Sequence, residues 1–423
     1  MIPSVVPCPG GSPWDEARQV VERLRQKGHE TWMVGGCVRD LLLGFPVQDV
    51  DVTTSAHPDQ VEELFTRTVS VGRAFGVIVV VQKNGRHIEV ATFRNDGAYI
   101  DGRRPETVRF GTVREDVERR DFTVNALLYD AESGKITDHV GGLEDLQAHR
   151  LRTVGEPARR FGEDRLRILR GLRFAARLNF TIEPFTWQAL CQETLAGLSA
   201  ERLMQEWEKA LLGPWVGDWL SLLADSGHLS ALFPPDAAPD HHAQHHLKRA
   251  FERLEGSESL AVRQALWLQR CPISSVERWL IGLPGARERQ ERVRWLLRQE
   301  TPTSIMTWPL ARRRRLLQDT AMGELLAFQR CLSGPEPALA ELCVQKDVEC
   351  QGGPWRKLLC AKDLLGLGCL PGPRLGRLLI RLEDAQLAGA FSTHETGLIL
   401  ARRLLAEDTE TEKERGHELF SRR

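Results

Sequence analysis

The sequence predicts an α+β protein with a small N-terminal head, a mixed sheet with helices, followed by an all-helical remainder. Two observations indicate this division. Residues 31–150 contain short β-branched segments bounded by Gly, Asn or Asp, which is typical of strands, with helical stretches between them. From about residue 156 onward, Leu, Ile and Phe recur at three- and four-residue steps, which is the spacing of amphipathic helices.

The composition is that of an ordinary globular protein. The 57 Lys and Arg residues nearly balance the 58 Asp and Glu residues, and hydrophobic residues make up 42% of the chain. These values exclude a largely disordered chain and a protein that holds nucleic acid by bulk positive charge. No apolar run approaches the roughly 20 residues of a membrane helix, so we expect no membrane partner. Nine cysteines without paired spacing, and an N-terminus without a secretory pattern, predict reduced thiols and a cytoplasmic location.

The head is expected to alternate strands with short helices. The helix near Pro58 has a good start, because Ser55 and Pro58 suit the first positions of a helix. The expected strands are 31–36, 48–54, 76–82, 86–93 and 126–132, and the expected helices are 37–44 and 57–68.

The remainder is expected to form several helical segments, separated by joints rich in Pro and Gly near residues 234, 272, 334 and 352. No fixed-period repeat indicates a solenoid. We predict four parts: a head at 1–150, a neck at 151–220, a body at 221–335 and a tail at 336–423.

The most informative segment, residues 34–54, contains two carboxylates behind a glycine turn. Asp49 and Asp51 are two apart in an expected strand, which places both on one face. Such a pair is often only a solvated strand edge, but crowded carboxylates also suit Mg²⁺. Gly35 and Gly36 lie between a strand and a helix, where the backbone can approach a triphosphate closely. Arg39, in the first turn or so, is expected to reach the phosphates.

A second cluster precedes the expected strand at 126–132. Arg119, Arg120, Asp121 and Asn125 combine donors for phosphate oxygens with groups that hydrogen-bond ribose hydroxyls. By itself, the cluster could equally be a surface ion pair.

A third cluster lies on the expected helix at 159–178. Asp164, Arg167, Arg170 and Arg173 are three apart and follow one helix face. Asp164 offers an acceptor and Arg167 a fork of donors, which is what reading the edge of cytosine or adenine requires. The alternative is an ordinary amphipathic helix with salt bridges.

Together, the Gly-Gly turn, the Arg-Asp pair and the Asp-x-Asp pattern resemble the DNA polymerase β superfamily of nucleotidyltransferases. More closely, they resemble the class II tRNA nucleotidyltransferases and bacterial poly(A) polymerases, over residues 31–235 and less closely over 360–400. The resemblance implies a nucleotidyltransferase head and a neck helix, starting at Glu163, that serves as a protein template. It also implies that Arg119, Arg120, Asp121 and Asn125 recognise the sugar, and that the tail binds RNA.

The activity that the resemblance implies is template-independent addition of CCA to the 3′ end of tRNA, with CTP and ATP as substrates. Two Mg²⁺ ions on Asp49 and Asp51 would serve the transfer, and pyrophosphate would leave. An A-adding tRNA enzyme and a bacterial poly(A) polymerase are the alternatives, and a non-catalytic RNA-binding homologue is a remote one. The loop at 97–111 resembles a flexible element that enzymes adding only C lack.

Three further features stay open at this point. Glu89, in an expected strand, could be a third acidic residue of the metal site or a surface residue. The histidines at 241–246 have i,i+4 spacing, which would suit a metal ion. The arginine run at 312–315 is either a solvated helix face or an RNA contact.

Overall fold

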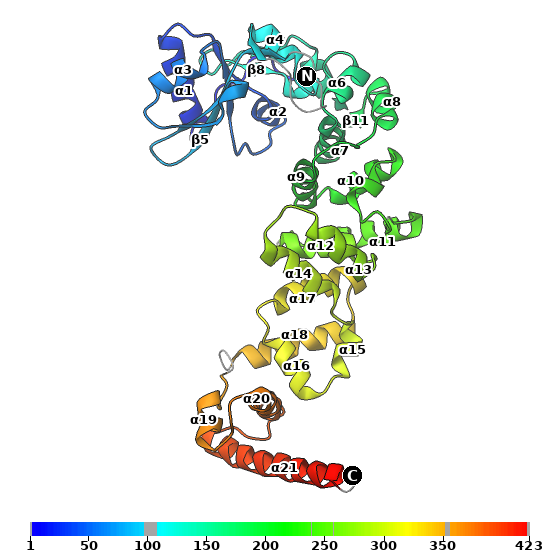
Figure 1. The fold of residues 1–423 in the computed structure, drawn as a ribbon. Helices are drawn as coiled ribbons and strands as arrows, with labels where there is room; N and C mark the ends of the chain where they lie inside the picture. The colour runs from blue at the N-terminus through cyan, green and yellow to red at the C-terminus, as the bar shows by residue number, and fades with distance from the viewer. Residues whose placement is uncertain (1, 97–107, 238, 257, 352–355, 421–423) are drawn as a thin grey trace. The chain divides into compact units, whose positions relative to one another are not determined.

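The computed structural model describes residues 2–96, 108–237, 239–256, 258–351 and 356–420. The chain forms two compact units, one of Met1–Lys248 with Arg278–Pro284 and one of Arg249–Glu277 with Gly285–Arg423. The predicted α+β class is confirmed, because a mixed sheet with helices is followed by a mostly helical chain (Figure 1). The division into four parts stays a prediction. In the described ranges, every helix is too short or too polar to cross a membrane.

A seven-stranded sheet forms the centre of the head, drawn in blue to cyan in Figure 1. The strand order is β3-β4-β5-β2-β1-β8-β9; β2 and β5 run parallel, and the other neighbours are antiparallel. Val52 pairs with Met33 on one side and Val90 on the other, and all three are buried. The strands are β1 (Thr31–Val34), β2 (Asp51–Thr54), β3 (Thr68–Gly72), β4 (Val77–Val81), β5 (His87–Thr92), β8 (Leu128–Tyr129) and β9 (Ile136–Thr137). Two-stranded sheets pair β6 (Arg94–Asp96) with β7 (Val108–Phe110) and β10 (Arg150–Leu151) with β11 (Thr181–Ile182).

Short helices surround this sheet, and one of them ends earlier than predicted. The expected helix at 57–68 stops at Leu64, because Phe65 is buried in an extended conformation and Thr68 already pairs with Val80 in the sheet. The head helices are α1 (Trp14–Gln26), α2 (Gly36–Leu42), α3 (Pro58–Leu64), α4 (Val113–Glu118) and α5 (Gly142–Gln147), with 3₁₀ turns η1 (Arg73–Phe75) and η2 (Thr123–Asn125).

The helix predicted at 159–178 is broken into two. Asp164 takes an extended backbone conformation, with φ −150° and ψ 101°, and its carboxylate accepts the amide hydrogen of Leu166 at 3.0 Å. An aspartate that caps the following helix competes with continuation of the preceding one. Asp164 therefore lies at the junction of the two helices, α6 (Pro157–Glu163) and α7 (Leu166–Leu178), rather than on a helix face.

The other helices of the chain follow in order. In the first unit, Trp207 and Trp219 are fully buried and anchor the helices that follow α7. These elements are α8 (Pro184–Gln192), α9 (Ala200–Leu211), α10 (Val216–Asp225), η3 (Leu229–Leu232) and α11 (His241–Glu252), of which α11 crosses the unit boundary. The remaining helices are α12 (Leu260–Leu268), α13 (Ile273–Ile281), α14 (Arg287–Leu297), α15 (Pro302–Met306), α16 (Leu310–Leu317), α17 (Met322–Ser333), α18 (Pro337–Gln351), α19 (Ala361–Gly366), α20 (Pro373–Leu387) and α21 (His394–Phe420).

The arginine run on α16 makes contacts within the second unit. The guanidinium carbon of Arg312 lies 3.5 Å from the ring centre of Trp308, and Arg313 donates to the carbonyl of Met306 at 2.7 Å. Arg314 and Arg315 pair with carboxylates of α18 and α20 at 2.7 Å. These contacts explain the run within the fold, and an RNA contact there stays a prediction.

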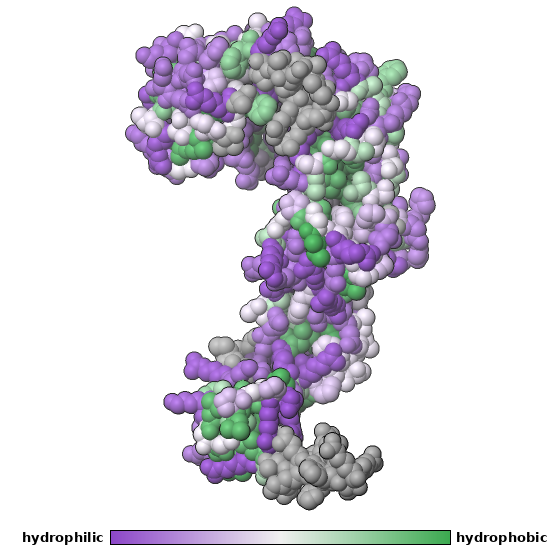
Figure 2. All heavy atoms as spheres, in the orientation of Figure 1, coloured by the Kyte–Doolittle hydropathy of each residue, from purple (hydrophilic) through white to green (hydrophobic). Residues whose placement is uncertain are grey.

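The C-terminal helices pack around a small core of their own, which includes Leu364, Leu378, Leu382 and Ala401. Figure 2 shows hydrophobic side chains gathered over the region of α19 and α20. Leu370 there is 80% exposed. The cysteines whose side chains the structure describes, eight of the nine, are free thiols.

The contact between α5 and η2 yields a test of the head's packing. A Cβ atom at Gly142 would overlap the carbonyl oxygen of Thr123, so we expect Gly142→Ala to destabilise the protein by about 1–3 kcal/mol. Gly162 in α6 is the control, because nothing lies within 4 Å of its Cβ position. Gly162→Ala should be neutral or stabilising by up to about 1 kcal/mol. Thermal unfolding measures both, and equal effects would contradict this packing.

Candidate functional site

One pocket of about 630 Å³ in the first unit collects all the residues that were predicted to bind the metal ion or the nucleotide. They come from four separate stretches of chain, around α2, β2, η2 and α7. The lining includes all thirteen of them: Gly35, Gly36, Arg39, Asp49, Asp51, Arg119, Arg120, Asp121, Asn125, Asp164, Arg167, Arg170 and Arg173. Their roles toward a nucleotide stay predictions.

The turn between β1 and α2 requires glycine at one position. Gly35 has φ +89°, a conformation that L-residues rarely adopt. A Cβ atom there would lie 3.5 Å from Nη1 of Arg120 and 3.6 Å from Oδ2 of Asp51. The bare backbone of Gly35 therefore forms the pocket wall between a guanidinium and a carboxylate.

The two predicted metal ligands line the same pocket, although only one of them is in a strand. β2 begins at Asp51, so the prediction that Asp49 belongs to the strand is wrong. Partial removal of Asp51 from water, together with the charges of Glu89 and Asp49, raises the pKa of Asp51 to about 6, against the opposing effect of Arg120. Glu89 thus acts electrostatically on Asp51, but it is not among the pocket-lining residues, and no group of three metal-ligating side chains occurs in the described ranges.

Two of the histidines on α11 lie close to each other. Nε2 of His242 and Nε2 of His246 lie 3.2 Å apart. The rings are on α11, away from the residues of the pocket, and they add no ligand to it.

Arg39 is buried in the wall of the pocket, and its contact with phosphates stays a prediction. Its side chain is 2% exposed and pairs with Asp40 at 2.7 Å. The guanidinium also donates to the side-chain oxygen of Asn125. Arg177 of α7 binds the other oxygen of Asp40 at 2.8 Å, so Asp40 connects α2 to α7. Asp40 had no predicted role, although it follows Arg39 directly in the sequence.

Arg119 and Arg120 are both held by one buried carboxylate, Asp116 of α4. Arg119 donates to Oδ1 at 2.6 Å and 2.9 Å, and Arg120 donates to Oδ2 at 3.2 Å. Thr53 of β2 also donates to Asp116, at 3.1 Å. Burial alone would raise the pKa of Asp116, but the two arginines lower it below its ordinary value. The spacing of three and four residues was the signal that could have revealed this anchor.

Asp121 joins the head to α7 through Arg170. Oδ2 of Asp121 accepts from Nε and Nη2 of Arg170 at 3.0 Å and 2.7 Å. Oδ1 accepts from the amide of Phe122 and the side chain of Asn125. Burial opposes ionisation here, yet Arg170 and these hydrogen bonds lower the pKa of Asp121 to about 2. Asp121 therefore stays ionised, and both of its oxygen atoms already accept hydrogen bonds from the protein.

The aromatic ring of Phe174 of α7 lies against three guanidinium groups. The guanidinium carbons of Arg39, Arg170 and Arg173 lie 5.1 Å, 5.3 Å and 4.5 Å from its ring centre. Such cation–π contacts are favourable, but they do not neutralise charge. Glu206 of α9, which is 2% exposed, neutralises the charge of Arg173, because it accepts a hydrogen bond from Arg173 at 2.7 Å.

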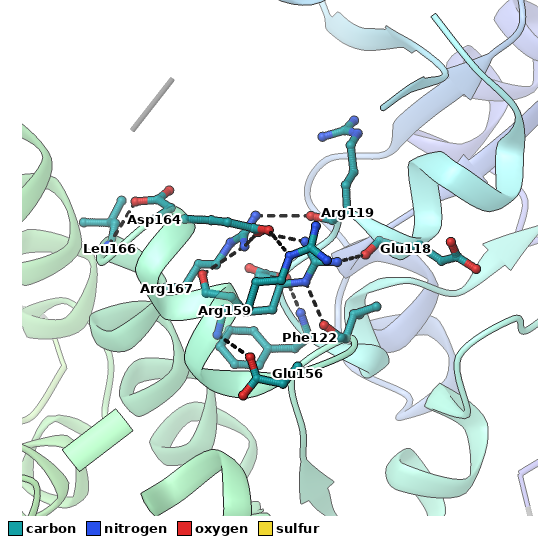
Figure 3. Close-up of polar contacts among 12 residues, drawn as sticks. Glu118, Arg119, Phe122, Glu156, Arg159, Asp164, Leu166 and Arg167 are labelled. Atoms are coloured by element: carbon teal, nitrogen blue, oxygen red, sulfur yellow. Dashed lines mark hydrogen bonds and ion pairs between the residues drawn. The ribbon is translucent and has the colours of Figure 1, made fainter. Parts of the chain in front are cut away.

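The residues predicted to read a base lie where α6 meets α7 (Figure 3). Arg167 donates to Glu163 at 2.8 Å. It also donates to the carbonyl of Arg119 at 3.2 Å, a contact that Figure 3 shows. Asp164 accepts two hydrogen bonds from Arg202 of α9, at 3.0 Å and 2.7 Å. Both predicted reading groups are therefore fixed by protein partners, and the distant Arg202 was left out of the predicted site.

The pocket as a whole is positively charged and offers no thiolate nucleophile at neutral pH. Eight basic and five acidic side chains line it. Cys37 is buried in its wall, and burial raises the pKa of this thiol to about 12. The arrangement suits a polyanion bound next to a carboxylate pair, with the reacting nucleophile supplied by a substrate.

Two family models match the chain. The model described as the poly A polymerase head domain matches residues 31–152. The model described as a probable RNA and SrmB-binding site of polymerase A matches residues 179–239.

Curated relatives are CCA-adding enzymes. That of Geobacillus stearothermophilus is 47% identical over 225 residues, which are 52% of this chain and 55% of the relative. The chain thus aligns with just over half the length of this relative. That of Streptococcus gordonii is 35% identical over 393 residues, which are 89% of this chain and 94% of the relative.

Solved structures agree in fold. The CCA-adding enzyme of Bacillus stearothermophilus in complex with CTP has a TM-score of 0.78 and 28% identity, and covers 95% of this chain and 100% of its own. The Thermotoga maritima CCA-adding enzyme complexed with tRNA has a TM-score of 0.65 and 19% identity, covers 94% of this chain and 97% of its own, and supports the fold alone.

The ion pair of Asp121 predicts a pH dependence of stability. A carboxyl group with a lowered folded-state pKa stabilises the fold above its unfolded pKa of about 3.9, and that stabilisation is lost as the pH falls toward about 2. We expect Asp121→Asn to remove about 2 kcal/mol of this pH-dependent stability. Urea unfolding at pH 7, 4 and 2.5 measures it. Parallel curves for the two proteins below pH 4 would contradict the assignment.

The buried carboxylate of Glu206 predicts a larger loss of stability at neutral pH than the ion pair of Asp121 does. Glu206→Gln leaves Arg173, which is 7% exposed, without its counter-ion, and breaking a buried pair costs about 3–5 kcal/mol. Glu201→Gln is the matched control on α9, because Glu201 is exposed. Urea unfolding of both variants tests this expectation, and a cost below that of the control would refute it.

Proposed function

The chain belongs to the family of CCA-adding enzymes, and from that premise we propose that it adds C, C and A to the 3′ end of tRNA, using CTP and ATP and releasing pyrophosphate. The observation that carries the proposal is the single pocket that brings together the carboxylate pair, the basic residues and the acceptor–donor pair at the α6–α7 junction. The CTP bound to the structural neighbour supports a nucleotide in the corresponding pocket.

The chemistry of the carboxylates fits a divalent cation. Asp49 and Asp51 present hard oxygen atoms to one pocket, where burial, and then the charges of Glu89 and Asp49, raise the pKa of Asp51, and a cation would favour its ionised form. We propose Mg²⁺ on these two residues. When bound, Mg²⁺ lowers the pKa of the attacking hydroxyl group and neutralises charge on the triphosphate.

The other residues bind and orient the nucleotide. The nucleophile is the 3′-hydroxyl of the RNA, so the protein needs no nucleophile of its own. Arg119 and Arg120, fixed by Asp116, present donors to the triphosphate beside the open backbone of Gly35. Asp121 and Asn125 serve the ribose together: one amide hydrogen of Asn125 is left for a hydroxyl group, and Asp121 holds that amide in place. Arg39 acts on the nucleotide through Asn125, to which it is bonded.

A second candidate activity is synthesis of poly(A), because the model that matches the head is described as that of a poly A polymerase. A-adding activity on a tRNA that already ends in CC is a third. The loop at 97–111 bears on this choice, but most of it, 97–107, lies outside the described residues. The predicted RNA-binding tail and the cytoplasmic location, which rests on the unpaired cysteines, remain part of the proposal.

One experiment separates these activities. The protein is incubated with Mg²⁺ and tRNA that ends before the first C, tRNA that ends in CC, or an unrelated RNA, with CTP and ATP separately and together. Growth of the first tRNA by CCA supports the proposal. A single A added only to the CC-ended tRNA indicates an A-adding enzyme, long A tracts on any RNA indicate a poly(A) polymerase, and no growth refutes all three.

The carboxylate pair gives the sharpest prediction for this activity. Asp49→Asn and Asp51→Asn should each lower kcat for nucleotide addition by at least about 1,000-fold, because the cation seat is lost. Asp59→Asn is the control, because Asp59 is an exposed carboxylate of the same head with its own arginine partner, Arg73. Single-turnover addition of C measures the effect. Near-normal rates for both variants would remove the metal assignment.

A further inference from the structure

The carboxylate of Asp164 is almost saturated with protein hydrogen bonds. A carboxylate has two oxygen atoms and about four acceptor positions. Oδ1 accepts from Arg202 at 3.0 Å and from the amide of Leu166 at 3.0 Å, whereas Oδ2 accepts from Arg202 at 2.7 Å. These contacts leave one acceptor position, on Oδ2, for a ligand in the pocket.

Arg202 binds the carboxylate of Asp164 from outside the pocket. Asp164 lines the pocket, but Arg202 does not. The pair is bidentate, with the side chains 16% and 17% exposed, so the fork of the guanidinium fixes the plane of the carboxylate. A base can therefore meet Oδ2 without displacing Arg202.

The neighbouring donor is fixed in the same manner. Nη1 of Arg167 uses both of its hydrogens on Glu163 and the carbonyl of Arg160, at 2.8 Å and 3.0 Å. Nη2 uses one hydrogen on the carbonyl of Arg119, at 3.2 Å. One hydrogen on Nη2 and that on Nε remain for a ligand.

The remaining groups match two of the four bases. The amino groups of cytosine and adenine are donors that suit the acceptor of Asp164, while the oxygen of uracil or guanine at the same position would meet an acceptor with an acceptor. This discrimination requires that Oδ2 point at the base. The double hydrogen bond from Arg202 fixes that direction.

We propose that Arg202 is a positioning residue that sets the choice of nucleotide by fixing Asp164 as a single, correctly aimed acceptor. This inference rests on the proposed function, because it concerns the same nucleotide pocket. Arg202 contacts no substrate, and its effect passes through Asp164.

The test compares nucleotide choice in Arg202→Gln and Arg202→Lys with that in the wild type. Dissociation constants of CTP, UTP, ATP and GTP are measured by calorimetry without RNA, and kcat/KM of each is measured for addition to tRNA. We expect Arg202→Gln to lower the preference for CTP over UTP, and for ATP over GTP, at least about tenfold, since an unpaired or misaligned polar contact governs such discrimination. Arg202→Lys should lie between, because lysine keeps the charge but not the fork.

Arg114 provides the matched control. It is an arginine of the head that pairs with Glu118 at 3.0 Å, but it is 70% exposed and lies outside the pocket. Arg114→Gln and Arg114→Lys should keep the wild-type preferences.

A coupling measurement separates positioning from a general structural role. In a chain that already carries Asp164→Asn, adding Arg202→Gln should change the preference for CTP over UTP no further. Uniform losses for all four nucleotides with unchanged preferences, in Arg202→Lys as in Arg202→Gln, would overturn the inference. Absence of any nucleotide addition by the wild-type protein would instead count against the proposed function.

Discussion

A network of alternating acidic and basic side chains joins the sheet of the head to α7 and α9, and the pocket depends on it. Each arginine that faces the pocket from α7 is tied to a carboxylate of another element. The pairs are Arg177 with Asp40, Arg170 with Asp121, Arg173 with Glu206 and Arg167 with Glu163. Without these carboxylates, four cations along one helix would repel one another within a poorly solvated space.

The network also limits what each residue can do. Arg39 and Arg167 use most of their hydrogen-bond donors on protein acceptors. Their guanidinium groups are therefore held in fixed orientations and are not free to move toward any nearby anion. Because the side chains that would contact the base are already held in place, they lose little orientational entropy when the ligand binds. Rigidity of this kind suits a protein that must choose between bases without a nucleic-acid template.

The sequence predicted the pocket well where its residues follow local spacing. The Gly-Gly turn, Asp49 with Asp51, and Arg119 to Asn125 each lie within a few residues, and each segment reaches the pocket as a unit. The anchors were missed for a physical reason. Glu206 and Arg202 lie 33 and 38 residues beyond their partners, and only tertiary packing brings them together.

Local competition explains the errors in the predicted elements. The periodicity of residues 159–178 favours one helix, yet Asp164 gives its side chain to the next helix and ends the first. The helix predicted at 57–68 has a helical pattern to its end, but Thr68 and Val69 pair with β4 instead. In both cases, a single hydrogen-bonding alternative outweighs a pattern spread over many residues.

The late position of α9 in the chain affects when the pocket can form during synthesis. The strands of the central sheet are complete once the ribosome has passed Thr137, whereas Glu206 and Arg202 follow dozens of codons later. At about 5–20 residues per second, a nascent chain spends a few seconds with its sheet strands synthesised while Arg173 still lacks Glu206 and Asp164 still lacks Arg202. The central sheet is therefore synthesised before Glu206 and Arg202, the residues that pair with Arg173 and Asp164.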